Sequence, residues 1–416
     1  MNLYRIVAVI VAVGALSACA VAAPSPSLTA TPPLAAVQPT QAVPASAVPT
    51  EAAAPTLPAL PTAAPTLPAT PALPAPPTSA AAPSLDRPLS LAEPRQNGTD
   101  VQALQQRLSE LGYFVGTVDG IFGPQAEVAV RAFQTLNGLE ADAIVGPQTW
   151  AALFDPTTEV APTVAPIVDV TQGFMIGGSY GGVWLNSMMT AVVLSDDLTA
   201  YQLYKAEGLL SPASGTLQRG EPIAREPCSD LNLVEMQLPA STVAVDLSGR
   251  VIGVGATWNA APRLPVELSA NELRDLEEPI GALLRRNGIA EPEVIINRAV
   301  RVDLEGDGSA EIIIEARRNA VAKDRQNFSV AAGDYSLLVV MRGNDASMIP
   351  VVESYYLENV DFAAPNTSIL LATLDLNNDG VLEMLVDSSY YEGTFTGIYG
   401  LAATQAELLA GAGCGV

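Results

Sequence analysis

The chain has 416 residues, which at about 150 residues per domain is enough for two or three domains. Its 44 acidic and 20 basic residues give a formal net charge of −24, which excludes the basic surface that nucleic acids and anionic lipids require. The chain contains no histidine, so catalysis by Ser-His-Asp or Cys-His groups is excluded as well. We therefore expect neutral polymers, cations or other proteins as partners, and no nucleic acid.

Residues 1–19 have the pattern of a secretory signal peptide. Arg5 precedes an apolar run over residues 6–15, which is shorter than the ~20 residues needed to span a bilayer. The run is followed by Leu-Ser-Ala-Cys, ending at Cys19, which resembles the lipobox of bacterial lipoproteins. This resemblance implies that Cys19 becomes the lipidated N-terminus and anchors the chain to a membrane. An ordinary signal peptide with an incidental cysteine is the alternative.

Residues 20–95 alternate proline with alanine, threonine and serine. Such a segment buries too little apolar surface to offset the entropy lost on ordering, and its prolines favour extended polyproline II conformations. We therefore predict a disordered stalk through which a lipid-anchored protein reaches into the cell wall.

Two cysteines remain once Cys19 is assigned to the anchor. Cys228 and Cys414 form an even pair in a chain that is expected to be exported from the reducing cytoplasm. We predict one disulfide between them, and two buried free thiols are the alternative.

Residues 96–154 have the apolar periodicity of short helices. Val101, Leu104, Leu108 and Leu111 recur at spacings of three and four residues, and similar stretches follow near residues 128–136 and 149–153. Glycines follow the first two stretches and mark turns. The pattern predicts three short helices around one small core.

This segment resembles the three-helix peptidoglycan-binding domain of bacterial cell-wall proteins. The matching motifs run along its whole length: Leu104-Gln105, Leu111-Gly112-Tyr113, Asp119-Gly120, Phe122-Gly123, Phe133-Gln134, Gly138-Leu139, Val145-Gly146 and Thr149-Trp150. Ala126 and Asp142-Ala143 depart from the threonine and the Asp-Gly turn that the family usually has. The resemblance implies peptidoglycan binding, with Tyr113, Asp119, Phe122 and Gln134 as the predicted ligand-lining residues. Core positions for Phe133, Trp150 and most of the leucines, and a turn-forming role for Asp119, are the alternatives.

Residues 155–169 form a second, Pro- and Val-rich linker, and residues 170–416 have the composition of a mixed domain. A helix over residues 269–287 is predicted by the capping-box pair Ser269 and Glu272 and by an apolar face, and a shorter helix is predicted near 186–194. Branched and aromatic residues predict strands at 199–204, 294–302, 312–316, 335–341, 369–374 and 384–386. The expected fold is a small all-α domain followed by a strand-rich α+β domain.

Two loops between these strands share one pattern. Residues 303–311 and 375–383 carry oxygen-bearing side chains at positions one, three, five and nine, with glycine at position six. This spacing suits Ca²⁺, which takes roughly six to eight oxygen ligands, and it resembles the Asp-x-Asp-x-Asp-Gly loops of integrin-like repeat proteins. The predicted ligands are Asp303, Glu305, Asp307, Glu311, Asp375, Asn377, Asp379 and Glu383. Acidic hairpin turns without a metal are the alternative.

The C-terminal segment also resembles a group of uncharacterised exported bacterial proteins, through Glu-Pro-Cys at residues 226–228 and Tyr-Tyr-Glu-Gly at residues 390–393. That resemblance implies no activity. The sequence favours an exported, lipid-anchored, non-catalytic protein that faces the cell wall, binds peptidoglycan and displays a binding or scaffold domain whose protein partner is unknown. The alternative is a carboxylate-dependent glycan hydrolase, for which Glu353 and Glu392 are candidates.

Overall fold

The structure is a computed structural model. It describes residues 83–414 except for 114–115, 195–199, 207, 215, 220–233, 238–248, 320–328, 344–347, 362, 364 and 391–392. The predicted signal peptide with Cys19, the stalk up to residue 82, Cys228 and Glu392 therefore lie outside the described residues.

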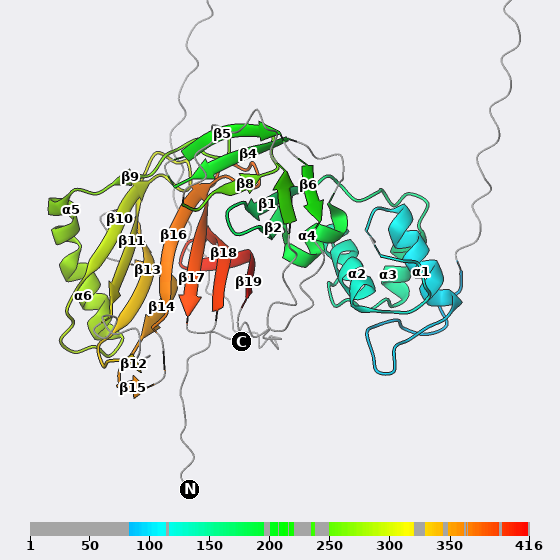
Figure 1. Cartoon of the computed structure of the whole chain (residues 1–416), viewed down its shortest axis with the longest axis horizontal. Helices are drawn as coiled ribbons and strands as arrows, with labels where there is room; N and C mark the ends of the chain where they lie inside the picture. Colours follow the sequence, from blue (N-terminus) through cyan, green and yellow to red (C-terminus); the bar gives the residue numbers. More distant parts are fainter. Residues whose placement is uncertain are drawn as a thin grey trace, which may run out of the picture. The chain divides into compact units, whose positions relative to one another are not determined.

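The first folded part contains the helices α1 (Thr99–Glu110), α2 (Pro124–Leu136) and α3 (Pro147–Phe154) (Figure 1). Leu104, Leu108 and Phe133 have no exposed surface, as their three- and four-residue spacing predicts. Glycine precedes each helix, and proline stands in the first turn of α2 and α3, where its missing N–H costs no helical hydrogen bond. The prediction of three helices around a small core is confirmed.

A segment ahead of α1 completes this core. We call residues 83–98 the N-terminal arm. Leu89 is fully buried, and its backbone exchanges two hydrogen bonds with Val145, 3.2 Å and 2.8 Å long. Nε1 of Trp150 donates to the carbonyl oxygen of Pro83 at 2.8 Å. The predicted end of the stalk at residue 95 is therefore wrong, because residues 83–95 fold with the helices.

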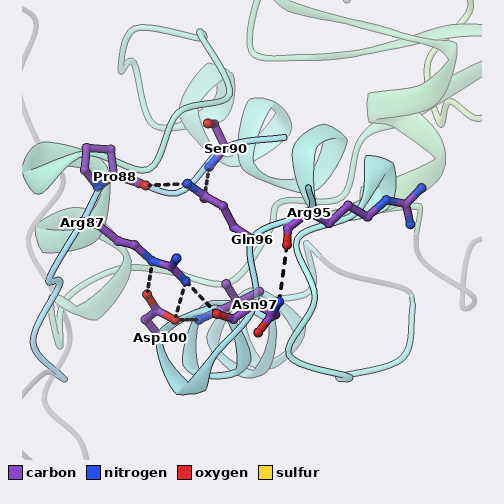
Figure 2. Close-up of polar contacts among 8 residues, drawn as sticks. Arg87, Pro88, Ser90, Arg95, Gln96, Asn97 and Asp100 are labelled. Atoms are coloured by element: carbon purple, nitrogen blue, oxygen red, sulfur yellow. Dashed lines mark hydrogen bonds and ion pairs between the residues drawn. The ribbon is translucent and has the colours of Figure 1, made fainter. Parts of the chain in front are cut away.

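Polar contacts hold the arm in shape (Figure 2). Nε of Arg87 lies 3.0 Å from Oδ2 of Asp100 in the first turn of α1, and Nη2 of Arg87 donates to the Asn97 carbonyl oxygen at 2.7 Å. The Gln96 side chain accepts a hydrogen bond from the Ser90 amide at 2.9 Å. The arm is thus tied both to itself and to the start of α1.

The described strands after residue 164 form three antiparallel sheets and two short pairs (Figure 1). The six-stranded sheet has the order β3-β2-β1-β8-β4-β5, with β1 (Ala165–Asp169), β2 (Phe174–Tyr180), β3 (Val183–Asn186), β4 (Ala200–Lys205), β5 (Gly208–Ser214) and β8 (Ile252–Val254). The five-stranded sheet has the order β14-β13-β11-β10-β9, with β9 (Val266–Glu267), β10 (Ile296–Val302), β11 (Glu311–Arg318), β13 (Tyr335–Met341) and β14 (Met348–Tyr355). The four-stranded sheet runs in chain order through β16 (Thr367–Leu374), β17 (Glu383–Tyr390), β18 (Gly393–Leu401) and β19 (Ala406–Cys414). The short pairs are β6 (Thr216–Arg219) with β7 (Val234–Gln237), and β12 (Ser329–Val330) with β15 (Val360–Asp361).

The four-stranded sheet lies between the other two sheets. One of its faces contributes Leu371, Leu385 and Ile398 to a cluster with residues of β1, β2 and β8. Residues of its other face, including Met384, pack against β10, β11 and β13. The outer face of the five-stranded sheet is covered by the helices α5 (Ala270–Asp275) and α6 (Glu277–Arg286). Apolar clusters on successive layers therefore form the core of this strand-rich domain.

Two predicted boundaries in this domain differ from the structure. The helix expected over residues 269–287 is divided at Leu276 into α5 and α6, because Pro279 cannot donate an amide hydrogen bond and is tolerated only in the first turn of a helix. The linker expected to end at residue 169 ends earlier, since β1 begins at Ala165 and all five of its residues are buried. The Ser269 and Glu272 capping box and the short helix α4 (Ser187–Val193) are present as predicted.

Candidate functional site

Two turns of the helical domain are built in the same way. The first turn, residues 119–122, precedes α2 and is held by Gln105 of α1. Nε2 of Gln105 donates to Oδ1 of Asp119 at 2.9 Å and to the Ile121 carbonyl oxygen at 3.0 Å, while its Oε1 accepts from the Gly120 amide at 2.7 Å. The Asp119 carboxylate also accepts from the Ile121 amide at 2.9 Å. One buried amide group thus fixes the whole turn.

The second turn, residues 142–145, precedes α3 and repeats this arrangement. Nε2 of Gln134 donates to Oδ1 of Asp142 at 2.9 Å and to the Ile144 carbonyl oxygen at 3.0 Å, and its Oε1 accepts from the Ala143 amide at 2.8 Å. Ala143 has a φ of 62°, close to the 74° of Gly120 at the equivalent position. The family's usual glycine is therefore replaced without loss of the turn, although a left-handed alanine is strained by roughly 1 kcal/mol.

Three of the four predicted ligand-lining residues lie inside the domain. Tyr113, Phe122 and Gln134 are 2%, 0% and 1% exposed. They do not line a surface, contrary to the prediction from the sequence, because two are core aromatics and Gln134 holds the second turn. Asp119 is exposed and shapes the first turn, as the alternative interpretation held. Ile121 and Ile144 are exposed beside these turns, and the repeated Asp-x-Ile spacing in the sequence marks both positions.

Hydrogen bonds keep the aspartates of both turns ionised. The pKa of Asp119 is lowered first by the hydrogen bond from Gln105, and that of Asp142 first by the bond from the Ile144 amide. Arg95 lies near enough to Asp119, and Arg131 near enough to Asp142, for their charges to lower these pKa values further. Both turns therefore present a negative and a positive group together.

The first acidic loop joins β10 to β11 and is closed by its own side chains. Asp303 accepts hydrogen bonds from the Gly306 amide at 2.6 Å and from the Gly308 amide at 3.0 Å. The buried Glu311 accepts from the Leu304 amide at 2.8 Å. Burial raises the pKa of Glu311, with smaller contributions from neighbouring acids.

The second acidic loop joins β16 to β17 and has the same construction. Asp375 accepts from the amides of Asp379 at 3.2 Å and Gly380 at 3.1 Å, and Glu383 accepts from the Leu376 amide at 2.8 Å. Glu383 is 3% exposed, and its burial, supported by the charges of Asp379 and Asp375, raises its pKa to about 8. Ionisation of the buried glutamate is therefore opposed more strongly in the second loop than in the first.

The two acidic loops contact each other. The Leu382 amide donates to the Leu304 carbonyl oxygen at 2.7 Å, and the Arg263 guanidinium donates to the carbonyl oxygens of Asp303 and Gly380, both at 2.6 Å. Across the described residues, no group of three or more acidic or cysteine side chains is arranged to hold a metal ion. In the structure, the carboxylates of Asp303, Glu311, Asp375 and Glu383 accept hydrogen bonds from backbone amides, and calcium binding by the two loops stays a prediction.

The other predicted sites are placed only in part. Glu353 is exposed on β14 and accepts a hydrogen bond from the Tyr355 hydroxyl at 2.8 Å. Cys414 ends β19 opposite Thr394. Because Cys19, Cys228 and Glu392 lie outside the described residues, the anchor, the disulfide and the hydrolase pair stay predictions. Within the described part of the chain, the helices are all too short or too polar to cross a membrane.

Comparisons with known proteins point to the helical part. Residues 97–153 match the family described as "Putative peptidoglycan binding domain". The chain is 44% identical over 64 residues to the N-acetylmuramoyl-L-alanine amidase CwlM of Mycobacterium tuberculosis, covering 15% of this chain and 16% of that protein. It is 43% identical over 56 residues to a spore cortex-lytic enzyme of Halalkalibacterium halodurans, covering 14% of this chain and 17% of the enzyme. The chain therefore spans less than a fifth of either enzyme.

A solved structure of an L,D-transpeptidase from Xylanimonas cellulosilytica is 28% identical and covers 34% of this chain and 58% of that chain. Its TM-score of 0.17 is too low to carry an argument about the fold. The residues that match the peptidoglycan-binding family, 97–153, are nearly the same as those of the three helices α1 to α3. The helical part of the chain is therefore a peptidoglycan-binding domain.

Proposed function

We propose that the protein binds peptidoglycan non-covalently through its helical domain and thereby holds the strand-rich domain at the cell wall as a binding or scaffold domain. The family match over residues 97–153 carries this proposal. The two turns of like geometry support it, because each is held by a buried glutamine and presents an aspartate and an isoleucine at the surface. A rigid, partly apolar surface with a few placed polar groups suits ligand binding.

Binding to the wall is tested by pelleting. The chain from residue 20 onward should sediment with insoluble peptidoglycan. We expect physiological salt to weaken binding but not to abolish it, because residues 97–153 contain only Arg107 and Arg131 as basic residues and general attraction to an anionic polymer is therefore small. The control is an acidic protein without such a domain. Sedimentation no greater than that of the control would contradict the proposal.

We further propose that the protein is exported and held in the cell envelope by a lipid on Cys19. The Leu-Ser-Ala-Cys sequence after a short apolar run supports this. The Cys19→Ser variant should leave the membrane fraction or remain unprocessed, because a lipoprotein's acyl chains supply its membrane affinity. Membrane partitioning equal to that of the unaltered chain would contradict the anchor. The proposed Cys228 to Cys414 disulfide is checked by mass spectrometry of the unreduced protein.

A second candidate function is hydrolysis of the cell wall, which is favoured by the amidase and cortex-lytic enzyme among the relatives. Their similarity covers the binding domain and a small share of each enzyme. Zymography of the full chain on embedded peptidoglycan distinguishes the two functions. A cleared band would favour the hydrolase, and its absence alongside retained binding would favour the scaffold.

Calcium binding by the two acidic loops is also proposed. It is supported by the repeated spacing of oxygen-bearing side chains and by the charge gathered around Glu383, which a divalent cation would offset. Calcium should raise the melting temperature more than magnesium does, by mass action on the folded state. Asp375→Asn with Asp379→Asn should remove most of this increase while keeping oxygen acceptors for the loop amides. Identical melting curves in chelator, calcium and magnesium would leave both loops as acidic turns.

A further inference from the structure

The peptidoglycan-binding domain exposes two aliphatic side chains at equivalent positions. Ile121 is 42% exposed and Ile144 is 43% exposed, each two residues after the aspartate of its turn. Leu91 is the third large apolar side chain that is exposed among the described residues from 83 to 156. A single exposed isoleucine is ordinary on a protein surface. Packing of the core does not account for an exposed isoleucine at the same position of both turns.

Each turn gathers an anion and an aliphatic group. The first has the Asp119 carboxylate, the Ile121 side chain and the nearby Arg95. In the second turn, Asp142 and Ile144 take the equivalent roles. Arg131 of α2 lies nearby, but its Nη1 donates to the Ala141 carbonyl oxygen at 2.7 Å and its Nη2 lies 3.8 Å from Oε1 of Glu127. Oδ1 of each aspartate accepts the amide hydrogen bond that shapes its turn. Both aspartates are exposed, so a ligand can reach the carboxylate. An anion and an aliphatic group are thus presented twice at the surface.

We propose that these two turns are equivalent contacts for the stem peptide of peptidoglycan, and this inference rests on the proposed function of the domain. A stem peptide carries alanine methyl groups, the amine of a diamino acid and free carboxylates. Isoleucine suits the methyl groups, aspartate suits the amine and arginine suits the carboxylate. The ligand therefore complements the aspartate and the isoleucine of both turns, and Arg95 near the first.

The glycan strand is a poorer match. Sugar rings are neutral, and their C–H faces pack best on exposed aromatic rings. In the described part of this domain, Tyr113, Phe122, Phe133 and Trp150 are all buried, and Phe154 is partly buried against Trp150, with ring centroids 4.6 Å apart. The exposed surface of the turns is aliphatic and charged instead. The peptide is the part of the polymer that this surface fits.

Competition distinguishes the two parts of the polymer. The chain from residue 20 onward is sedimented with insoluble peptidoglycan in the presence of millimolar free tetrapeptide or of soluble glycan strands stripped of peptide. We expect the tetrapeptide to release the protein and the glycan strands to leave it bound. Release by the glycan strands, or by neither competitor, would overturn the inference. No sedimentation without competitor would instead contradict the proposed function itself.

Substitutions locate the contact. Ile121→Ser combined with Ile144→Ser should raise the apparent Kd about ten-fold or more, because both exposed aliphatic contacts are lost. Asp119→Asn combined with Asp142→Asn keeps the oxygen that accepts from each turn amide but removes the charge, and should also weaken binding. The matched control is Val266→Ser with Leu408→Ser, two exposed aliphatic residues of the strand-rich domain. Melting curves check that each variant is folded, and folded turn variants that bind like the control would overturn the inference.

Discussion

Leu89→Ala should destabilise the peptidoglycan-binding domain by about 2–5 kcal/mol, the usual cost of emptying a fully buried leucine site. Leu89 has no exposed surface, and its backbone pairs with Val145 ahead of α3. Hydrogen exchange of amides in α1 and α2, measured in the full chain, should therefore become on the order of a hundred-fold faster or more. Leu91→Ala is the matched control two residues away, because Leu91 is exposed and its truncation should change exchange little.

The contribution of the arm to the core also predicts how stable a fragment of this domain is when the fragment begins at different residues. A fragment that begins at residue 97, where the family match begins, lacks Leu89 and the Pro83 carbonyl that accepts from Trp150. It should be less stable than a fragment that begins at residue 83. Equal stability of the two fragments, or unchanged exchange in Leu89→Ala, would show that the arm is not part of the core.

Glu383→Gln should stabilise the strand-rich domain at pH 8 by about 2 kcal/mol or more when no metal is present. Burial raises the pKa of Glu383 to about 8 in the folded chain, from an ordinary value near 4.5. The folded chain therefore binds a proton that the unfolded chain has lost. The stability contributed by this group is fully present below about pH 4.5 and is lost as the pH rises through 8. Glutamine still offers an oxygen to the Leu376 amide but carries no charge.

The measurement is urea unfolding in chelator at several pH values between 5 and 8.5. The unaltered chain should lose stability across this range, and Glu383→Gln should have a flatter profile. Glu358→Gln, at an exposed position, is the control. If Glu383→Gln and Glu358→Gln gave the same slope, the buried carboxylate would not be the titrating group.

Local patterns predict those parts of the fold whose neighbours lie close in sequence. The three helices follow from apolar spacing, and β13 matches the predicted range 335–341 because it is a continuous apolar run buried on both faces. The hairpin of β18 and β19 was not predicted, since glycines and threonines interrupt its pattern. The arm has the same proline-rich composition as the segment before it, so the sequence predicts a stalk there. Its one apolar anchor, Leu89, pairs with a residue more than fifty positions away, which composition does not reveal.

The candidate site could be predicted only as a region. The sequence identifies the motif around Gln134 but does not show which way the amide points, and in the structure it faces inward to hold a turn. The exposed isoleucines follow from the same geometry, since a turn fixed from inside directs its next side chain outward. For the acidic loops, the sequence shows the spacing of the oxygen-bearing side chains, while the backbone amides that donate to these oxygens are visible only in three dimensions.

The arm also decides where mechanical load enters the domain. A pull on the N-terminal end of the arm acts first on the hydrogen bond that Trp150 donates to Pro83. It acts next on the ion pair of Arg87 with Asp100 in the first turn of α1, then on the antiparallel pair of Leu89 with Val145, and last on the pair of Asn97 with Ile121. Both backbone pairs end in the two turns. A pull on the arm is therefore shared between these two turns and the contacts that the arm makes with α1 and α3.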